Sequence, residues 1–246
     1  MAGELPLQAE LDIRIFSFLG AIFRAENNTR LRQLATRQLA VGNKHSWFHH
    51  VIQLSHKYNI ELEGHMEAPW RKKTWKDYIA TIINNYWLQK LLQDAKAKSS
   101  LMYLNTEIIT INKPHRIWTS CKNSPKLVTA ATTRVKLLTR TYPLEARVAK
   151  FKKPPGDGIC KLCSKEKEDT AHFLFRCQAS AHIYKDRLEG LSRQGFHLSS
   201  YSTDPVSTLL NGPPATLEKA LQIDNNISLL CHRLHNFRLN RLNRLK

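Results

Sequence analysis

Apolar residues recur every three or four positions along most of this chain, which is the spacing of one face of an α-helix. The repeats predict helices over residues of about 8–24, 29–40, 44–58, 74–98, 124–140, 179–193 and 216–246. Thr29 and Ser124 precede two of these stretches and suit the N-cap position, and Pro125 fits a first helical turn. The pattern therefore predicts a mainly α protein, an irregular helical bundle that ends in a C-terminal helix.

Two segments break this helical pattern. Residues 107–112, E-I-I-T-I-N, are rich in β-branched side chains and favour a short extended piece. Residues 196–215 are rich in Ser, Thr, Gly and Pro and are typical of a loop. We expect three parts: a helical N-terminal body over residues 1–120, a basic helix with a knuckle over 121–195, and a loop with a basic helix over 196–246.

Two predicted helices carry wide apolar faces. The face from Trp75 to Trp87 is rich in aromatic rings and follows a basic stretch, Arg71–Lys73, so it fits either base stacking or a hydrophobic core, and core packing is favoured. The stripe from Ile223 to Phe237 forms a seam that suits packing on the body of the protein or on a partner helix. Self-association through a helix therefore remains open.

Charge adds a statement about partners. The chain has 246 residues with 38 Lys and Arg against 20 Asp and Glu, for a formal net charge of +18. Such an excess favours a polyanion, most often nucleic acid, although a solvated basic surface is the plainer alternative. The most one-sided run contains only one acid, Glu145, among the basic residues Arg134, Lys136, Arg140, Arg147, Lys150, Lys152 and Lys153.

That run leads into the strongest chemical signal in the chain, the spacing C-x2-C-x8-H-x4-C formed by Cys160, Cys163, His172 and Cys177. Three thiolates and one imidazole make a complete tetrahedral set for Zn²⁺, and a closed set indicates one structural ion and no catalytic metal. We expect His172 on a short helix with Cys177 just past its end. His182, four residues beyond Cys177, is a rival ligand, but His172 is preferred because it completes the set without leaving a cysteine stranded.

The knuckle adds three further bases, Lys161, Lys165 and Arg176, beside the basic run. Together the ten basic residues predict a surface that follows phosphates.

No catalytic arrangement is evident in the sequence. It has no P-loop, no G-x-S-x-G motif, no Rossmann glycines and no paired aspartates in a strand context. Cys121 and Cys231 are the thiols outside the knuckle, and neither has a local activator. We therefore expect no enzyme activity from these residues.

Location and membrane contact follow from the same features. An odd number of cysteines, five, suits a reducing compartment. The first residues carry acids and no basic leader, and the apolar run Ile13–Phe23 is short and interrupted. We expect an intracellular protein, nuclear or cytoplasmic, that does not enter a membrane.

The run G-I-C-K-L-C-S-K-E-K-E-D-T-A-H-F-L-F-R-C-Q resembles the zinc-binding segment near the C-terminus of non-LTR (LINE-type) retrotransposon reverse transcriptases. The likeness is specific over about Lys126–Arg187 and looser over Leu5–Lys126. It implies a zinc site at the same four residues, in a region that helps to bind template RNA or target DNA. The catalytic aspartates and the endonuclease of that family lie outside the matching residues. Lys161 stands where the family usually has proline.

The prediction is thus a non-catalytic, zinc-binding, nucleic-acid-binding remnant of a retrotransposon reverse transcriptase protein. The alternative is a zinc-stabilised protein-interaction module that docks a partner through the Trp75–Trp87 or Ile223–Phe237 face.

Overall fold

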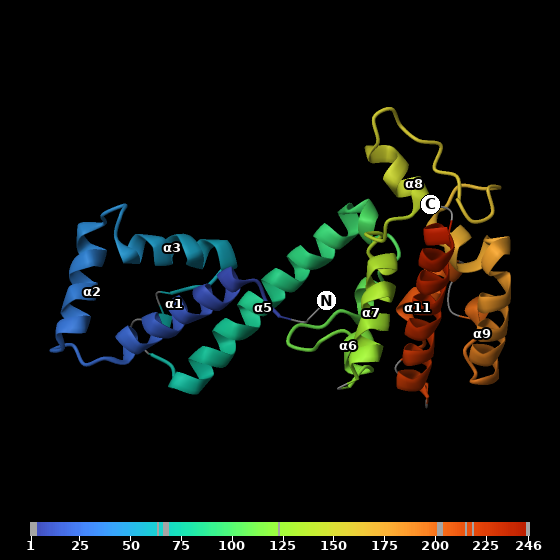
Figure 1. Cartoon of the computed structure of the whole chain (residues 1–246). Helices are drawn as coiled ribbons and strands as arrows, with labels where there is room; N and C mark the ends of the chain where they lie inside the picture. The colour runs from blue at the N-terminus through green and yellow to red at the C-terminus, as the bar shows by residue number, and fades with distance from the viewer. Residues whose placement is uncertain are drawn as a thin grey trace. The chain divides into compact units, whose positions relative to one another are not determined.

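A computed structural model describes residues 4–62, 64–65, 69–122, 124–200, 204–214, 216–217 and 219–244. Helices dominate these residues, which contain no named strand and one isolated β-bridge, so the mainly α prediction is confirmed (Figure 1). The chain divides into two compact units that meet near residue 93, Gly3–Gln93 and the part from Asp94 onward. The predicted boundaries after residues 120 and 195 do not coincide with this division.

The N-terminal unit is built from α1 (Leu7–Arg24), α2 (Arg30–Val41), α3 (Trp47–Tyr58) and most of α5 (Lys72–Ala97). Thr29 caps α2 by accepting a hydrogen bond from the Arg32 amide, as its position in the sequence predicts. The core contains Phe16, Leu19, Val51, Ile79 and Ile83. The aromatic face of α5 therefore serves core packing, and Trp75 is buried within it.

The C-terminal unit contains the remaining elements. Its longer helices are α7 (Pro125–Leu138), α9 (Ala181–Arg193), α10 (Pro205–Asn211) and α11 (Ala220–Arg244). Its short turns are η1 (Ser99–Leu101), η2 (Thr106–Ile108), α6 (Arg116–Thr119), α8 (Glu145–Val148), η3 (Ala149–Phe151), η4 (His172–Arg176), η5 (Gln178–Ser180) and η6 (Leu198–Ser200).

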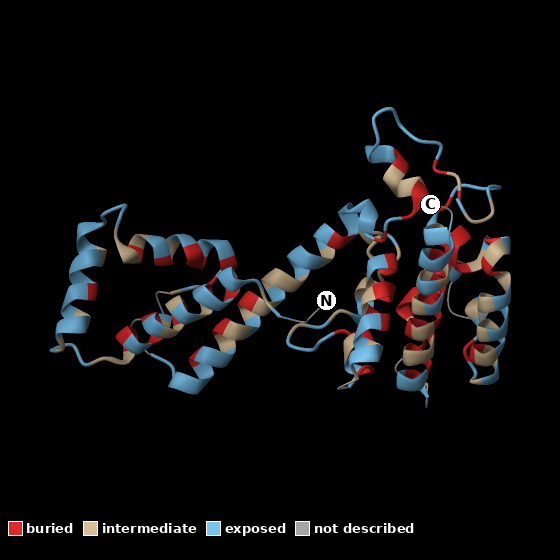
Figure 2. Ribbon diagram, viewed as in Figure 1, coloured by how far each residue is buried: buried red, intermediate tan, exposed pale blue. Residues whose placement is uncertain are grey.

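The helix α11 is the centre of this unit. It packs most extensively on α7 and next on α9, and its seam residues Ile223, Ile227, Leu230 and Leu234 are fully buried. Figure 2 shows buried positions along this helix. The seam thus packs on the body of the protein. A helix with one apolar stripe reaches the middle of a bundle when neighbours cover that stripe from two sides, as α7 and α9 do here.

Two local predictions were wrong. Residues 107–112 form no strand, and Thr106–Ile108 is a 3-10 turn that Asn105 caps through the Glu107 amide. The predicted loop 196–215 contains α10, whose N-terminus is Asp204–Pro205: Asp204 accepts hydrogen bonds from the Val206 and Ser207 amides. An N-cap acid before proline is a helix start, and the surrounding Ser, Thr, Gly and Pro obscured it.

No helix in the described part of the chain combines the length and the apolar character that crossing a bilayer requires.

Candidate metal centre and its basic surround

Four side chains, those of Cys160, Cys163, His172 and Cys177, converge at one point in the C-terminal unit, and their ligand atoms all lie within 4.8 Å of one another. The Cys160 and Cys177 sulfurs are 3.9 Å apart, and the Cys163 sulfur is 3.4 Å from His172 Nε2. The first, third and fourth of these residues are buried and Cys163 is partly exposed. This arrangement can hold one metal ion, and it is the one Cys/His/acid cluster found among the described residues.

The first two ligands lie on a tight turn. The Ser164 amide donates to the Cys160 carbonyl at 2.8 Å, and the Cys160 amide donates to the Glu166 carbonyl at 2.8 Å. Ser164 adopts a left-handed conformation, with φ of 55°. The isolated bridge between Ile159 and Lys167 closes the base of this turn. Two residues between the cysteines are therefore enough to point both sulfurs to the same side.

The other two ligands flank η4, a π-helical turn. Asp169 caps it by accepting a hydrogen bond from the His172 amide at 2.6 Å. The Cys177 amide donates to the His172 carbonyl at 2.8 Å. This bond joins residues five positions apart, which is the pattern of a π-helix. An α-helix would place residues five apart on different faces, whereas the wider turn brings both to the cluster. Cys177 lies just past the turn, as expected.

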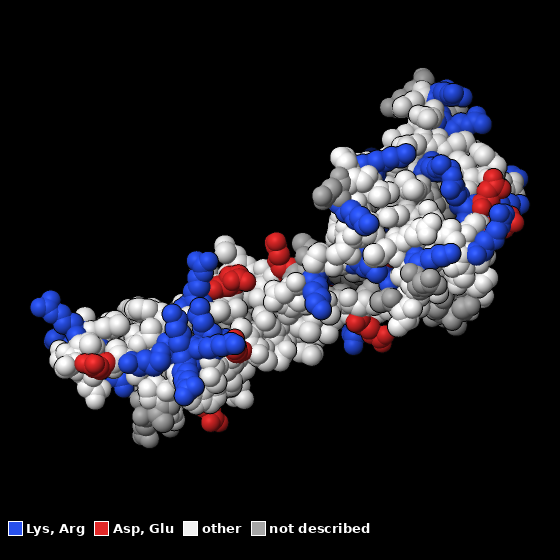
Figure 3. Space-filling model, turned by 90° about the horizontal axis from the view of Figure 1, so that it is seen from below, with Lys and Arg blue, Asp and Glu red and all other residues white. Residues whose placement is uncertain are grey.

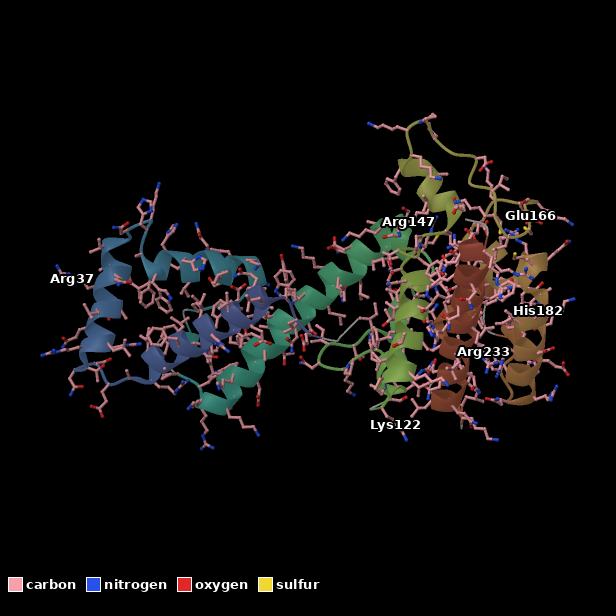
Figure 4. The ribbon with its side chains drawn as sticks, in the orientation of Figure 1. Arg37, Lys122, Arg147, Glu166, His182 and Arg233 are labelled. Atoms are coloured by element: carbon pink, nitrogen blue, oxygen red, sulfur yellow. The ribbon has the colours of Figure 1, made fainter. Side chains whose placement is uncertain are left out.

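A second ring of contacts orients the imidazole. His172 Nδ1 lies 3.3 Å from Oε2 of Glu166, a residue labelled in Figure 4, and the other ring nitrogen, Nε2, faces the Cys163 sulfur. A carboxylate on the outer nitrogen fixes the ring and makes the inner nitrogen a better metal ligand. His182, the rival ligand, is exposed on α9 with its ring against Phe237, outside the cluster.

A buried ion pair attaches the knuckle to the bundle. Glu168 is buried and accepts hydrogen bonds from Arg238 on α11 at 2.7 and 2.8 Å, and also from the Glu145 amide at 2.8 Å. Burial opposes the charge of Arg238, but the contact with Glu168 outweighs it and raises the pKa of the guanidinium. The knuckle is thus fixed to the central helix at the residue directly before Asp169.

The pKa values of Cys160 and Cys163 are shifted in opposite directions. Burial raises the pKa of the Cys160 thiol to about 12, helped by the neighbouring Cys177 and Glu168. Burial alone would raise the pKa of Cys163, but hydrogen bonds from the amides of Lys165 and Glu166 and from the other two thiols together outweigh it, so its pKa is lowered. A cluster of this kind releases protons when a cation binds, because the metal holds its cysteines as thiolates.

The basic residues predicted to contact phosphate divide into three groups. Arg134 was predicted wrongly, because its side chain is completely buried and bonds Asp224 at 2.9 Å and the Leu210 carbonyl at 2.9 Å. Lys152 and Lys161 face Glu145, and Arg176 pairs with Asp169 at 3.0 Å. No carboxylate among the described residues pairs with the remaining six, Lys136, Arg140, Arg147, Lys150, Lys153 and Lys165.

The exposed surface of the C-terminal unit is accordingly basic. Figure 3 shows Lys and Arg side chains spread over one face of this unit with far fewer acidic side chains among them. An exposed ion pair such as that of Arg176 with Asp169 contributes only about 0–1 kcal/mol to stability. A base in such a pair can therefore exchange its carboxylate partner for a phosphate at little cost in free energy.

Sequence reasoning missed Glu166, Glu168 and Arg238. Glu166 could have been identified as a partner of the His172 ring because it lies in the turn between Cys163 and His172. The signal for Arg238 was its position one turn beyond Leu234 on the buried seam, where a charge needs a partner. Its partner, Glu168, lies 70 residues earlier, and nothing in the sequence near either residue indicates that the two pair.

Comparison with known proteins adds no relative: no protein-family model, curated protein or solved structure matches this chain.

Proposed function

We propose that the cluster binds one structural Zn²⁺ and that the C-terminal unit is a non-catalytic nucleic-acid-binding module. The observation that carries the zinc assignment is the distance between ligand atoms. Two sulfurs that each lie about 2.3 Å from a tetrahedral zinc are about 3.8 Å apart, and a sulfur and a nitrogen are slightly closer. The separations of 3.9 Å for Cys160 with Cys177 and 3.4 Å for Cys163 with His172 agree with this geometry.

The donor set supports zinc over harder cations. Ca²⁺ and Mg²⁺ prefer oxygen ligands, whereas three sulfurs and one nitrogen suit Zn²⁺. With all four positions filled by protein, the ion would serve folding and would leave no place for a substrate. Cys121 and Cys231 are buried, and burial raises the pKa of both thiols, so neither is a good nucleophile.

Nucleic-acid binding is supported by the six bases without a carboxylate partner among the described residues, which lie on or just after α7, on or just after the α8–η3 segment, and in the knuckle. The expected origin, the C-terminal region of a non-LTR reverse transcriptase, is consistent with a basic approach to a zinc knuckle. The alternative of partner docking has less support, because the Ile223–Leu234 seam and the Trp75, Ile79 and Ile83 face are already buried inside the two cores.

The metal is tested by Cys163→Ser with His182→Ala as its matched control. Zinc content by elemental analysis should fall from one ion per chain to near zero in Cys163→Ser and stay at one in His182→Ala. Cobalt substitution should give a thiolate charge-transfer band only where the site is intact. A structural zinc contributes on the order of 10 kcal/mol to the folding of a small knuckle, so residues 158–177 should lose protection from hydrogen exchange in the serine variant. Unchanged zinc content in Cys163→Ser would refute this site.

Nucleic-acid binding is tested by fluorescence polarisation with single- and double-stranded RNA and DNA at 50 and 200 mM salt, with and without chelator. Six phosphate contacts on a single strand predict a loss of affinity on the order of 300-fold over this fourfold rise in salt. Association through an apolar helical face would change little with salt. Absence of binding to all four nucleic acids would end the proposal.

A further inference from the structure

A hollow of about 620 Å³ lies beside the knuckle, within the C-terminal unit. Its walls are the C-terminal end of α7, the α8–η3 segment, the turn Pro155–Gly158 and the knuckle residues Lys167–Thr170. Arg147, which Figure 4 labels, lies on α8 in one wall. A volume of this size suits a small molecule or one nucleotide unit and is too small for a helix or a duplex.

Two of the three acids that line the hollow, Glu168 and Asp169, are paired with arginines. Glu168 is held by Arg238 on α11, and Asp169 binds Arg176 at 3.0 and 3.1 Å. Asp157 accepts a hydrogen bond from the neutral Ile159 amide at 2.9 Å and has no base as a partner in the part of the chain that the structure describes, so one carboxylate charge remains at the hollow.

The bases that line the hollow keep their charge unneutralised. Arg140 donates to the Ser99 carbonyl at 2.9 Å and to Met102 sulfur, and Arg147 donates to the Arg140 carbonyl, so both guanidiniums bond neutral acceptors. Lys150 and Lys167 have no ion-pair or hydrogen-bond partner for their side chains within the described ranges. Four cationic groups around one hollow, without carboxylate partners, favour an anion there.

The rim carries an aromatic ring that the core does not use. Phe151 is 77 % exposed, and in the sequence it lies between Lys150 and Lys152–Lys153. An exposed phenyl ring flanked by ammonium groups is the combination on which single-stranded nucleic acids stack, because each base offers a π-face and each phosphate a charge. Bases inside a duplex are already stacked and cannot reach such a ring without unstacking.

We propose that this hollow binds single-stranded nucleic acid, with a phosphate among Arg140, Arg147, Lys150 and Lys167 and the adjoining base stacked on Phe151. The proposal rests on nucleic-acid binding by the C-terminal unit and adds the strand state and the contact residues. It makes the zinc knuckle one wall of the binding site, since Lys167 follows the turn that carries Cys160 and Cys163.

The ring is tested in the full-length, zinc-loaded chain with fluorescein-labelled single-stranded RNA and DNA of mixed sequence and with the matching duplexes. Phe151→Ala and Phe151→Leu should each weaken single-strand binding by about 5- to 150-fold, and Phe151→Trp should retain it. Duplex affinity should change less than twofold in all three. Because Phe151 is exposed, these variants should unfold at the same urea concentration as the wild type. Leu34→Ala, which removes an exposed apolar side chain from α2, is the control and should bind normally.

The charges are tested by Lys150→Gln and Lys167→Gln, with Lys185→Gln on α9 as the control. Each of the first two should lower the slope of log affinity against log salt by about 0.7 on a single strand, and the control should leave it unchanged. Wild-type affinity for Phe151→Ala or Phe151→Leu, or equal losses on single strands and duplexes, would overturn the hollow as the binding site while leaving nucleic-acid binding intact. Failure of the wild type to bind any probe would overturn both proposals.

Discussion

A group of buried charged residues links several helices of the C-terminal unit. Arg134 and Asp224, both completely buried, form an ion pair that Arg116 also joins. Arg134 also caps the end of α10 through the Leu210 carbonyl. Breaking such a pair by removing one charge leaves the other buried without compensation, so this group contributes to holding α6, α7, α10 and α11 together.

A buried histidine beside this group makes stability depend on pH. Burial, together with the charges of Arg134 and Arg116, lowers the pKa of His115 to about 4 from its ordinary value of 6.5. As pH falls from 6.5 to 4 the unfolded chain gains a proton that the folded chain resists, so the folded state loses up to about 3 kcal/mol from this residue.

The prediction is tested with His115→Asn. In the wild type His115 Nδ1 accepts a hydrogen bond from the Ile117 amide, and the asparagine side chain keeps an acceptor for it. Between pH 6.5 and 4, the free energy of unfolding measured with urea should fall more for the wild type than for the variant. Parallel pH profiles for the two proteins would contradict the prediction, and the comparison cancels acid loss of zinc because both proteins share the site.

A glycine sets the packing of the N-terminal unit. A Cβ at Gly20 would overlap the Trp75 ring, whose Nε1 donates to the Phe16 carbonyl at 2.7 Å. Gly20→Ala should therefore destabilise this unit by about 2–3 kcal/mol through overpacking. Gly190→Ala on α9, where a Cβ meets nothing within 4 Å, should be neutral or stabilising by about 0.5–1 kcal/mol. Urea titration of both variants measures the difference, and equal midpoints would refute the role of Gly20.

At the scale of elements, α11 and the π-turn η4 determine where the metal cluster lies. The turn brings His172 and Cys177 to the same side, and α11 holds Glu168 through Arg238. A knuckle of about twenty residues has little core of its own, so its position depends on zinc and on this link to the helix.

Arg238→Gln should separate these two contributions. It leaves Glu168 buried without a cation, which costs about 3–5 kcal/mol, while the four ligands stay in place. We expect one bound zinc, a lower urea midpoint and faster hydrogen exchange over residues 144–170. Arg233→Gln, an exposed arginine on the same helix, is the control and should resemble the wild type. If the two variants have the same stability, the ion pair is not the anchor.

At the scale of the whole molecule, the described residues form two hydrophobic cores that share no buried residue among them. One contains the aromatic residues of α1, α3 and α5, and the other is organised around α7 and α11. Units with separate cores respond separately to local changes.

Metal removal should therefore act on one core only. We expect chelation to speed hydrogen exchange in residues of the Asp94–Lys246 unit, with the largest change in the knuckle, and to leave α1, α2 and α3 unaffected. Exchange measured by mass spectrometry before and after chelator gives the result. Equal deprotection of α1 and the knuckle would mean that the two cores unfold as one.

The amino-acid sequence by itself determined the helical class, most helix positions, the caps at Thr29 and Ser124, and the four-residue metal cluster. These features depend on neighbours within about twenty residues, where helical periodicity and ligand spacing act directly. The sequence also shows that residues 134–153 are strongly basic, but it does not show which of these basic side chains are buried or paired with an acid.

Only the tertiary structure decided which charges are buried and which face solvent. Arg134 meets Asp224 across 90 positions and Arg238 meets Glu168 across 70, and no local pattern pairs them. The same folding buries the Ile223–Leu234 seam, reveals α10 within an apparent loop, and leaves Phe151 exposed beside four unneutralised bases. The physical reason is that burial and ion pairing depend on the path of the whole chain, whereas periodicity and spacing depend on adjacent turns.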